Sequence, residues 1–569
     1  MTATTLDGDL GRALVEILDR GEDAEAIQDQ ARQVGGCAHP IRLHGQLDTI
    51  DRTTGQLEQA WSSEGLPDGV VHTRCNNRRA SRCEPCSRLY QQDAWQVVVS
   101  GLAGGKDVPD TVAGHPTVFV TLTAPSLGLV HTRVTDSSGR VLPCRARRDQ
   151  ADEVCEHGRP VTCTARHDED DPCLGRPLCM DCWDYAGAVL WNAHAGELWR
   201  RTRIRIYREL AALVGVSERR LKREVSIQYV KVAEYQRRGV VHFHLVIRLD
   251  AARPPAVERL GVPWRAPHRV TPPPARYTID LLAQAIRNAV AYTQVPYPGH
   301  LLNEPADDQA HGVEASSCAS VGAGQGPEAF PQGKCEAPLT RGQCLRLEAG
   351  DPSGSLTQPS LFTPPINRDQ VRHRRLPDVS LIPRARAARW GGQVDVREVA
   401  GEERGKVAGY LAKYATKHTE CVGGLDRRLK VEDLDALPVS EHIHRLVVAA
   451  WLLAIHDPQL RTDRWAHQLG YKGHFLTKSR YYSTTFTKLR LARARWVAWQ
   501  RALNRLDPWE LMRQTAGRVL RKRWQVAGFG WRLEGDALLA RTVREQQRAQ
   551  REAAREARAE LIEALALAG

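Results

Sequence analysis

The spacing of apolar residues predicts strands in two stretches of the chain and helices in several others. In residues 115–126, HPTVFVTLTAPS, apolar and polar side chains alternate with the period of two that is typical of a strand. Residues 224–250 predict two strands around a tight turn, QRRG, at 236–239. Because strands and helices occur together, the chain is expected to be an α+β protein. The predicted helical stretches are one or two helices in 1–34, then 187–215, 405–420 and the basic region 441–540.

The second strand of the predicted hairpin carries two histidines. In VVHFHLVIRL, period-two alternation places His242 and His244 side by side, opposite an apolar face. Two imidazoles one pleat apart can form a divalent-metal site, and the turn would bring Glu234 back beside them. A His-His-carboxylate set with open positions suits Mg²⁺ or Mn²⁺ acting on phosphate, although it also describes non-haem iron oxygenases. The alternatives are core histidines and a Glu234 that pairs with Arg237 or Arg238 on the surface.

The helix predicted over 405–420 brings tyrosines and lysines together. In GYLAKYATK, Tyr410 and Tyr414 share a helix face, and Lys413 and Lys417 form the neighbouring pair. Lysine offers a compact charge for a phosphate. A metal that polarises a phosphodiester, a tyrosine nucleophile and a neutralising lysine make up a phosphoryl-transfer site, which would leave a 5′-phosphotyrosyl link and a free 3′-OH. The alternative is an amphipathic helix whose tyrosines pack on a core.

Fourteen cysteines, ten of them in the first third of the chain, predict bound metal rather than disulfides. Cys83-x2-Cys86 is a strong half-site, because that spacing lets both thiolates reach one zinc ion. Cys75 and Cys37 complete a four-cysteine set, with His39 as a substitute ligand. Free buried cysteines are the alternative.

A second cysteine- and histidine-rich segment, 144–182, predicts a further zinc site. Its firmest pair is Cys179 and Cys182, and Cys163 with His167 is the partner pair. Both cysteine segments are expected to be structural, because closed sulfur-rich sites leave no open position for chemistry. Cys144, Cys155 and His157 build a further site or none, and Cys173 is another candidate ligand of the segment.

The charge balance points to a polyanionic partner. Lysine and arginine number 80 against 67 acidic residues, a net charge of +13, and the pI is about 9.2. Nucleic acid is therefore the expected partner. The basic residues expected to contact DNA are Arg78, Arg79, Arg82, Lys478 and Arg480.

Nothing in the hydropathy predicts a membrane protein. No stretch approaches the roughly 20 apolar residues of a membrane span. The N-terminus, MTATTLDGDLGRALVEILDRGEDAEA, is acidic and lacks the apolar run of a signal peptide. We therefore expect a cytoplasmic protein with no membrane partner.

Three tracts resemble, in order, the motifs of the HUH endonuclease superfamily, specifically the replication initiators of actinobacterial (Streptomyces-type) rolling-circle plasmids and integrative elements. They are FVTLTAPS (119–126), EYQRRGVVHFHLVI (234–247) and GYLAKYATK (409–417). Tracts at 75–90, 177–201 and 473–486 are also similar to this family. The resemblance covers most of 37–300 and 385–500.

This resemblance implies an HUH endonuclease domain with a central antiparallel sheet flanked by helices. By position, His242 and His244 ligate the catalytic metal, Glu234 is the third ligand and Tyr414 is the nucleophile. Tyr410 matches the two-tyrosine variant, either as a second nucleophile or as a packing residue. The implied function is sequence-specific, metal-dependent nicking and rejoining of origin DNA, which starts rolling-circle replication. The implied partners are double- and single-stranded origin DNA and a host helicase, since the chain has no Walker A motif.

The expected organisation combines these motifs with the composition of the segments between them. The expected regions are an N-terminal helical segment (1–36), a zinc-binding basic segment (37–100), the first part of the nuclease domain (115–300) with the inserted zinc segment (144–182), a disordered linker or insertion (301–385), the catalytic tyrosine helix (386–425), a basic helical DNA-binding region (426–540) and a charged C-terminal helix (541–569).

Other functions fit parts of this pattern. A conjugative relaxase or an HUH transposase would keep the metal and the tyrosine and act on other DNA ends. A zinc-stabilised DNA-binding regulator without catalysis would keep only the cysteine segments and the basic charge. Metal-dependent cleavage of a supercoiled origin plasmid separates the regulator from the enzymes.

Overall fold

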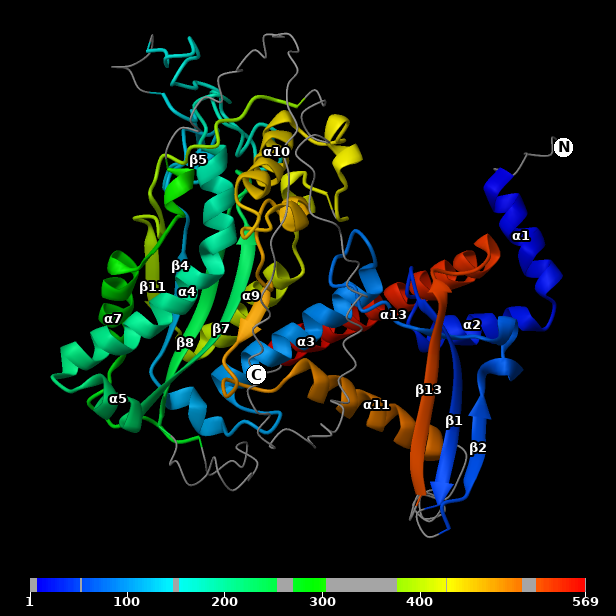
Figure 1. Ribbon diagram of the computed structural model, residues 1–569. Helices are drawn as coiled ribbons and strands as arrows, with labels where there is room; N and C mark the ends of the chain where they lie inside the picture. The colour runs from blue at the N-terminus through cyan, green and yellow to red at the C-terminus, as the bar shows by residue number, and fades with distance from the viewer. Residues whose placement is uncertain are drawn as a thin grey trace, which may run out of the picture. The chain divides into compact units, whose positions relative to one another are not determined.

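The computed structural model describes residues 8–51, 54–146, 153–252, 270–302, 376–425, 427–503 and 518–567 (Figure 1). Most of the stretch predicted as a linker, 303–375, lies outside the described residues. None of the described helices is both long and apolar enough to cross a membrane.

A five-stranded antiparallel sheet, in the order β11-β4-β8-β7-β12, forms the centre of the fold. The strand with the two histidines, β8, is the middle strand, so its backbone groups are paired on both sides. The prediction of an α+β fold with antiparallel sheets and helices is confirmed. The strands are β4 (Thr117–Leu122), β7 (Val225–Tyr235), β8 (Val241–Ala251), β11 (Val394–Glu398) and β12 (Leu476–Lys478).

The predicted hairpin at 224–250 is present as β7 and β8. The Gln236 amide donates to the Val240 carbonyl at 2.8 Å, which closes the turn. Gly239 has a φ of +83°, a value that a residue without a Cβ adopts at no steric cost. This tight turn sets a register in which Glu234 lies directly opposite His242.

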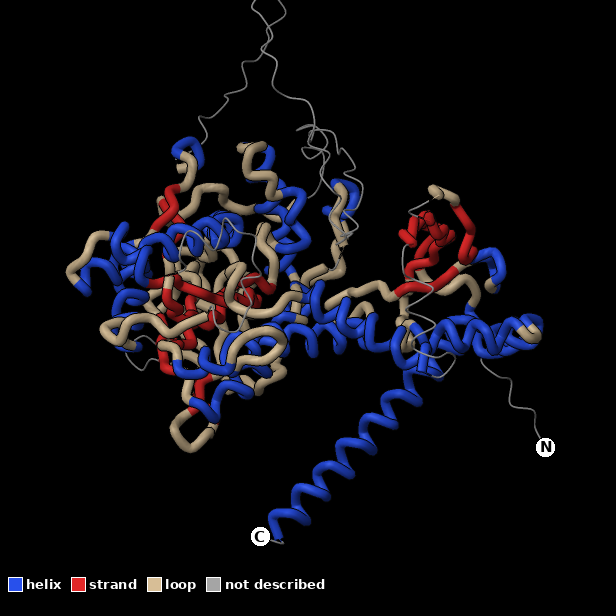
Figure 2. The backbone as a smooth tube through the Cα atoms, turned by 90° about the horizontal axis from the view of Figure 1, so that it is seen from below, coloured by secondary structure: helices blue, strands red, loops and turns tan. Residues whose placement is uncertain are grey.

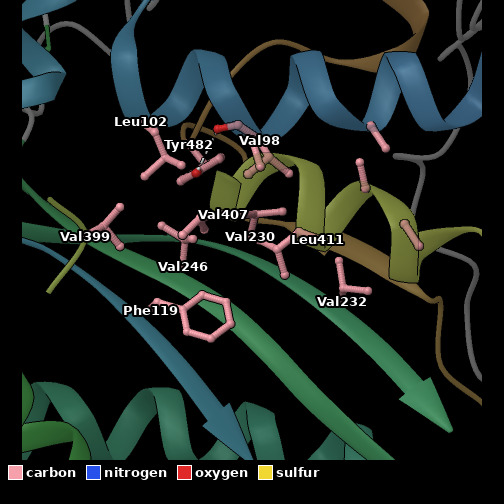
Figure 3. Packing of buried hydrophobic residues seen from close by; sticks show 14 residues of the cluster. Val98, Leu102, Phe119, Val230, Val232, Val246, Val399, Val407, Leu411 and Tyr482 are labelled. Carbon is pink, nitrogen blue, oxygen red and sulfur yellow. Dashed lines mark hydrogen bonds between the residues drawn. The ribbon is translucent and has the colours of Figure 1, made fainter. Parts of the chain in front are cut away.

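Two helices cover the face of the sheet that carries the histidines. They are α3 (Glu84–Ala103) and α9 (Arg404–Ala415). Figure 3 shows α9 between α3 and the strands, with apolar side chains from all three converging. The buried residues of this core include Val98, Leu102, Phe119, Val230, Val246, Val407, Leu411 and Tyr482.

The opposite face packs on the long helix α4 (Tyr185–Val214), which confirms the helix predicted at 187–215. Trp199 of α4 lies edge-on to Tyr229 of β7, with ring centroids 5.2 Å apart. The shorter helix α7 (Ile279–Tyr292) packs beside α4. These two layers bury both faces of the sheet, so the hairpin is held rigidly.

A second sheet corrects the predicted organisation. Strand β13 (Arg518–Phe529) pairs along the whole of β1 (Ile41–Asp51), although 441–540 was expected to be helical. The alternation of apolar and polar residues in β13 is interrupted by three consecutive basic residues, Arg521, Lys522 and Arg523. The strand that pairs with β13 lies more than 450 residues earlier in the chain. Figure 2 shows the strands of both sheets in red. The remaining strands of this sheet are β2 (Leu57–Ser62) and β3 (Val71–Thr73).

Several helices match the predicted helical stretches. The N-terminal segment forms α1 (Gly8–Arg20) and α2 (Asp23–Gln33), as expected. The charged C-terminal helix, α13 (Glu534–Leu567), begins earlier than predicted, and Ala540 and Val543 bury against Ala31 of α2. Within 441–540, the helices are α10 (Glu441–His456) and α11 (Phe486–Leu503).

The core around the tyrosine helix contains residues from regions that were predicted to be separate. Helix α3 was assigned to the zinc-binding segment, but it packs on α9. Strand β12 and Tyr482 lie in the region expected to be a separate helical unit, yet both complete the central sheet and its core. Burial of apolar surface decides these memberships, and local periodicity does not reveal them. The minor elements are α5 (Glu218–Glu224), β5 (Val134–Thr135), β6 (Val141–Leu142), β9 (Gln294–Pro296) and β10 (Ala387–Arg389).

Candidate active site of the central sheet

The structure brings Glu234, His242 and His244 together on one face of the β7–β8 hairpin. Oε2 of Glu234 lies 2.9 Å from Nε2 of His242 and 3.2 Å from Nε2 of His244. One ligand atom from each of the three side chains lies within 4.8 Å of the others. The predicted set is therefore assembled by two adjacent strands, without help from a distant segment.

A neighbouring strand orients the second histidine. Thr121 of β4 is the register partner of His244, and its Oγ1 lies 3.2 Å from Nδ1 of that ring. A hydrogen bond at Nδ1 leaves Nε2 directed at Glu234. His244 is nearly fully buried, and this burial lowers the pKa of the imidazole. Burial thus favours the neutral imidazole, the form that binds a metal.

Glu234 is the charged centre of the site. Burial opposes its ionisation, but hydrogen bonds from His242, His244 and Lys417 outweigh that effect and lower the pKa of Glu234 to about 2. Nζ of Lys417 donates to Oε1 of Glu234 at 2.8 Å, which leaves Oε2 for the two imidazoles. The carboxylate is thus ionised at neutral pH and presents one oxygen toward the histidines.

Both tyrosines of α9 reach this site. The hydroxyl of Tyr410 lies 3.3 Å from Nε2 of His244. The ring of Tyr414 lies 5.5 Å from the His244 ring and 4.4 Å from the Tyr410 ring, between centroids. Burial and the neighbouring Tyr414 raise the pKa of Tyr410. The helix face predicted from the four-residue spacing therefore does face the metal-ligand candidates.

The lysines behave differently from the predicted pair. The helix expected over 405–420 ends at Ala415, so Lys417 lies beyond it and turns back to Glu234, with Nζ 4.2 Å from the centre of the Tyr414 ring. Lys413 is exposed on the helix. Arg78 stabilises this end, because its Nη1 donates to the carbonyls of Ala415 at 3.1 Å and Lys417 at 2.7 Å.

Comparison with known proteins identifies the family to which this chain belongs. Residues 23–312 and 352–545 match the family described as replication initiator protein, pSAM2. A replication initiator protein of Streptomyces ambofaciens is 36% identical over 542 residues, which covers 93% of this chain and 92% of the relative. The chain belongs to this replication initiator family. No solved structure matches it.

Among the DNA contacts expected for this initiator, Arg78 already has partners within the protein. Its guanidinium donates to the end of α9 and lies 3.9 Å from the centre of the Phe475 ring, and the residue is only partly exposed. Arg79 lies 3.8 Å from Glu420. Arg82 and Arg480 are exposed, as a phosphate contact requires. Lys478 ends the edge strand β12, and its Nζ also donates to nearby backbone carbonyls.

The first cysteine cluster of the initiator contains the four predicted residues. The Sγ atoms of Cys37, Cys75, Cys83 and Cys86 lie within 4.8 Å of one another. Cys83 and Cys86 lie at the start of α3, so this cluster connects the chain before α3 to a helix that packs on the tyrosine helix. His39 is exposed and is not part of the cluster.

The second cysteine segment is arranged differently from the prediction. The expected set of Cys163, His167, Cys179 and Cys182 is divided between two clusters. Sequence spacing also missed a residue, His131, because it lies before the segment and has no nearby partner at a metal-ligand spacing. The two clusters are His131, Cys144, Cys163 and His167, and Cys155, His157, Cys179 and Cys182.

Proposed function

We propose that this protein starts rolling-circle replication by nicking and rejoining origin DNA with HUH-type chemistry. The observation that carries the proposal is the convergence of Glu234, His242 and His244 with Tyr410 and Tyr414 on one face of the central sheet. Membership of the replication initiator family supports origin DNA as the substrate. The net charge of +13 favours binding to that polyanion.

The three ligand candidates fit a divalent cation. One carboxylate oxygen and two imidazole nitrogens face one another within 4.8 Å, and Thr121 holds one ring so that Nε2 is directed at the site. Mg²⁺ or Mn²⁺ bound there would polarise a phosphodiester oxygen. The chain's own contribution is to hold the ligand set rigidly on two buried strands and to place the tyrosine hydroxyls beside it.

Tyr414 is proposed as the first nucleophile. Its oxygen would form a bond to phosphorus while the bond between phosphorus and the 3′ oxygen breaks, so that the hydroxyl proton is finally carried by the new 3′-OH. Lys417, whose ammonium lies 4.2 Å from the Tyr414 ring centre, would offset the negative charge that develops on the phosphate. The 5′-phosphotyrosyl link conserves the phosphodiester bond energy, and the strand can be rejoined without ATP.

Tyr410 is proposed to act at the second cut. A replicating enzyme cuts once to start and once to terminate, and the first tyrosine is occupied by DNA at the second event. The two rings are 4.4 Å apart between centroids, so both hydroxyls can reach a phosphate held at the same ligand set. Alternate attack by the two residues would release the replicated strand as a circle.

The four-cysteine cluster is proposed to hold a structural zinc ion. Four sulfur ligands close the coordination sphere, which leaves no position for substrate. Since the chain has no Walker A motif, we also propose that a separate host helicase unwinds the nicked DNA.

The test is adduct formation on single-stranded oligonucleotides that tile the DNA next to the gene, each labelled at its 3′ end. With Mg²⁺ or Mn²⁺, the labelled fragment should become attached to the protein, and the double variant Tyr410→Phe/Tyr414→Phe should form no adduct. Origin binding without cleavage by the wild type would favour a non-catalytic regulator. Cleavage confined to transfer-origin or transposon-end sequences would favour a relaxase or a transposase.

A further inference from the structure

The two clusters in the second cysteine segment have distances that distinguish metal ligation from other contacts. Nδ1 of His131 lies 3.2 Å from Nε2 of His167, and Sγ of Cys163 lies 3.6 Å from that same nitrogen. In the other cluster, Nδ1 of His157 lies 3.3 Å from Sγ of Cys182. The cysteines of both clusters are free thiols, with no disulfide between them.

A tetrahedral zinc site predicts these separations. With zinc–sulfur bonds of about 2.3 Å and zinc–nitrogen bonds of about 2.0–2.1 Å, the tetrahedron edges are about 3.8 Å between sulfurs, about 3.6 Å between sulfur and nitrogen, and about 3.3 Å between nitrogens. The observed nitrogen–nitrogen and sulfur–nitrogen distances of 3.2, 3.6 and 3.3 Å match these edges to about 0.3 Å. In the four-cysteine cluster, Cys37 lies 3.7 Å from Cys83 and 3.6 Å from Cys86 between sulfurs, as such a site requires.

The surroundings of the first of these clusters support ligation. Nδ1 of His167 donates to Oδ2 of Asp171 at 2.7 Å, the carboxylate–histidine arrangement that leaves Nε2 free for a metal. The amide of Thr132 lies 3.2 Å from Sγ of Cys144 and donates to it, which stabilises a thiolate. The ligand atoms, the tautomer of His167 and the amide that donates to Cys144 therefore all suit the binding of one metal ion.

This cluster is also connected to the catalytic hairpin. Asp171, which holds His167, accepts a hydrogen bond at its backbone carbonyl from Nη1 of Arg237 at 3.2 Å, and Nη2 of Arg237 donates to the carbonyl of Glu169. Arg237 lies in the turn between Glu234 and His242. At Gly175, with a φ of +84°, an added Cβ would lie only 2.4 Å from the backbone of Arg237. The segment and the turn therefore pack directly against each other.

We propose that the segment binds two zinc ions rather than one, and that the first of them braces the turn of the catalytic hairpin. The bracing ion is held by His131, Cys144, Cys163 and His167, and the other by Cys155, His157, Cys179 and Cys182. With the four-cysteine site, the chain would bind three zinc ions with nine sulfur and three nitrogen ligands. Both ions are structural, because each cluster supplies four protein ligands.

Zinc stoichiometry of the purified full-length protein tests the number of sites. The expected values are three zinc ions for the wild type, two for Cys163→Ser and one for the double variant Cys163→Ser/Cys179→Ser. A single shared site predicts two ions in the wild type and one in both variants, and that result would overturn the proposal. Cys421→Ser is the control, because Cys421 is exposed and outside every cluster, and it should retain three.

If the variants fail to fold, a measurement on the wild-type protein can still test the number of zinc sites. X-ray absorption at the zinc edge should give an average of three sulfur and one nitrogen ligands per ion. An average above three sulfurs, with a stoichiometry of two, would support the single shared site instead.

The bracing role has its own readout, which does not depend on nicking. His131→Ala should lose one zinc ion and speed amide hydrogen exchange in residues 236–240 by about tenfold or more. Cys155→Ser should also lose one ion but leave exchange in those residues unchanged. Equal exchange in the two variants would show that the first ion does not brace the hairpin, whether or not the enzyme nicks DNA.

Discussion

The Glu234–His242–His244 site and the four-cysteine cluster gather metal-ligand candidates in opposite ways. The first uses three polar side chains of one hairpin and has tyrosines, a threonine and a lysine around it. The second uses four thiols, with amides of Ala38 and Cys75 donating to sulfur. Three ligands leave positions for substrate, whereas four sulfurs leave none. A reaction is therefore expected at the site whose coordination sphere is incomplete, and a contribution to the stability of the fold at the site whose coordination sphere is closed.

The largest effect should come from removing a ligand of the open site. His242→Ala or His244→Ala should reduce nicking by about 1,000-fold or more, because the phosphate would lose its polarising metal. Binding to duplex origin DNA should be largely retained, since basic residues elsewhere are expected to supply those contacts. Nicking and gel-shift assays on the same preparations check this, and equal loss of both activities would mean that the histidines serve the fold.

Chelation should separate the two kinds of site in the wild type. Mild EDTA treatment should stop nicking completely, and added Mg²⁺ or Mn²⁺ should restore it. Zinc should stay bound throughout, because thiolates hold zinc far more tightly than a histidine–carboxylate set holds Mg²⁺ or Mn²⁺. Elemental analysis before and after treatment provides the measurement. Zinc loss in step with activity would remove the distinction between the sites.

The two tyrosines should differ in which cut they serve. Tyr414→Phe should eliminate the first covalent adduct, because it removes the attacking hydroxyl. Tyr414 is assigned to the first cut because Lys417 places positive charge beside its ring. Tyr410→Phe should still form the adduct but should rejoin or recircularise the strand poorly. Adduct yield on single-stranded DNA and circle formation on an origin plasmid measure the two steps. If Tyr410→Phe is normal in both, Tyr410 is a packing residue, and if Tyr414→Phe still forms the adduct, the nucleophile is assigned wrongly.

The two lysines offer a matched pair with a smaller expected effect. Lys417→Met should lower the nicking rate by about 100-fold, because it removes both the charge beside Tyr414 and the hydrogen bond to Glu234. Lys413→Met removes the same charge from the exposed side of α9 and should change the rate by less than about threefold. Single-turnover kinetics at saturating DNA would compare them. Similar losses in both variants would indicate general attraction of DNA rather than a role at the site.

The smallest effect is expected for Arg78, which donates to carbonyls at the end of the tyrosine helix. Arg78→Met should lower the free energy of unfolding by about 1–3 kcal/mol, because the carbonyls of Ala415 and Lys417 would lose their donor. Affinity for duplex DNA should change little, since the guanidinium is already hydrogen-bonded to these two carbonyls. Denaturant titration and a binding isotherm give the two values. A large loss of affinity with unchanged stability would restore Arg78 as a phosphate contact.

Local pattern was sufficient for the parts of the site that lie close together in sequence. Period-two alternation placed His242 and His244 on one face, and a four-residue turn was enough to set Glu234 opposite His242. The four-residue spacing of Tyr410 and Tyr414 placed both on one side of a helix. These predictions succeed because the geometry of a strand, a tight turn and a helix depends only on neighbouring residues.

Tertiary structure alone decided the contacts between distant residues. Arg78, 337 residues before Ala415, donates to the carbonyls at the end of α9, and Lys417, which lies beyond that end, reaches Glu234. His131 joins Cys144, Cys163 and His167 because the chain folds back on itself, with no signal in the spacing. Periodicity predicts which face of a helix or strand a residue occupies. Burial of apolar surface and the pairing of polar groups determine which distant part of the chain packs against that face.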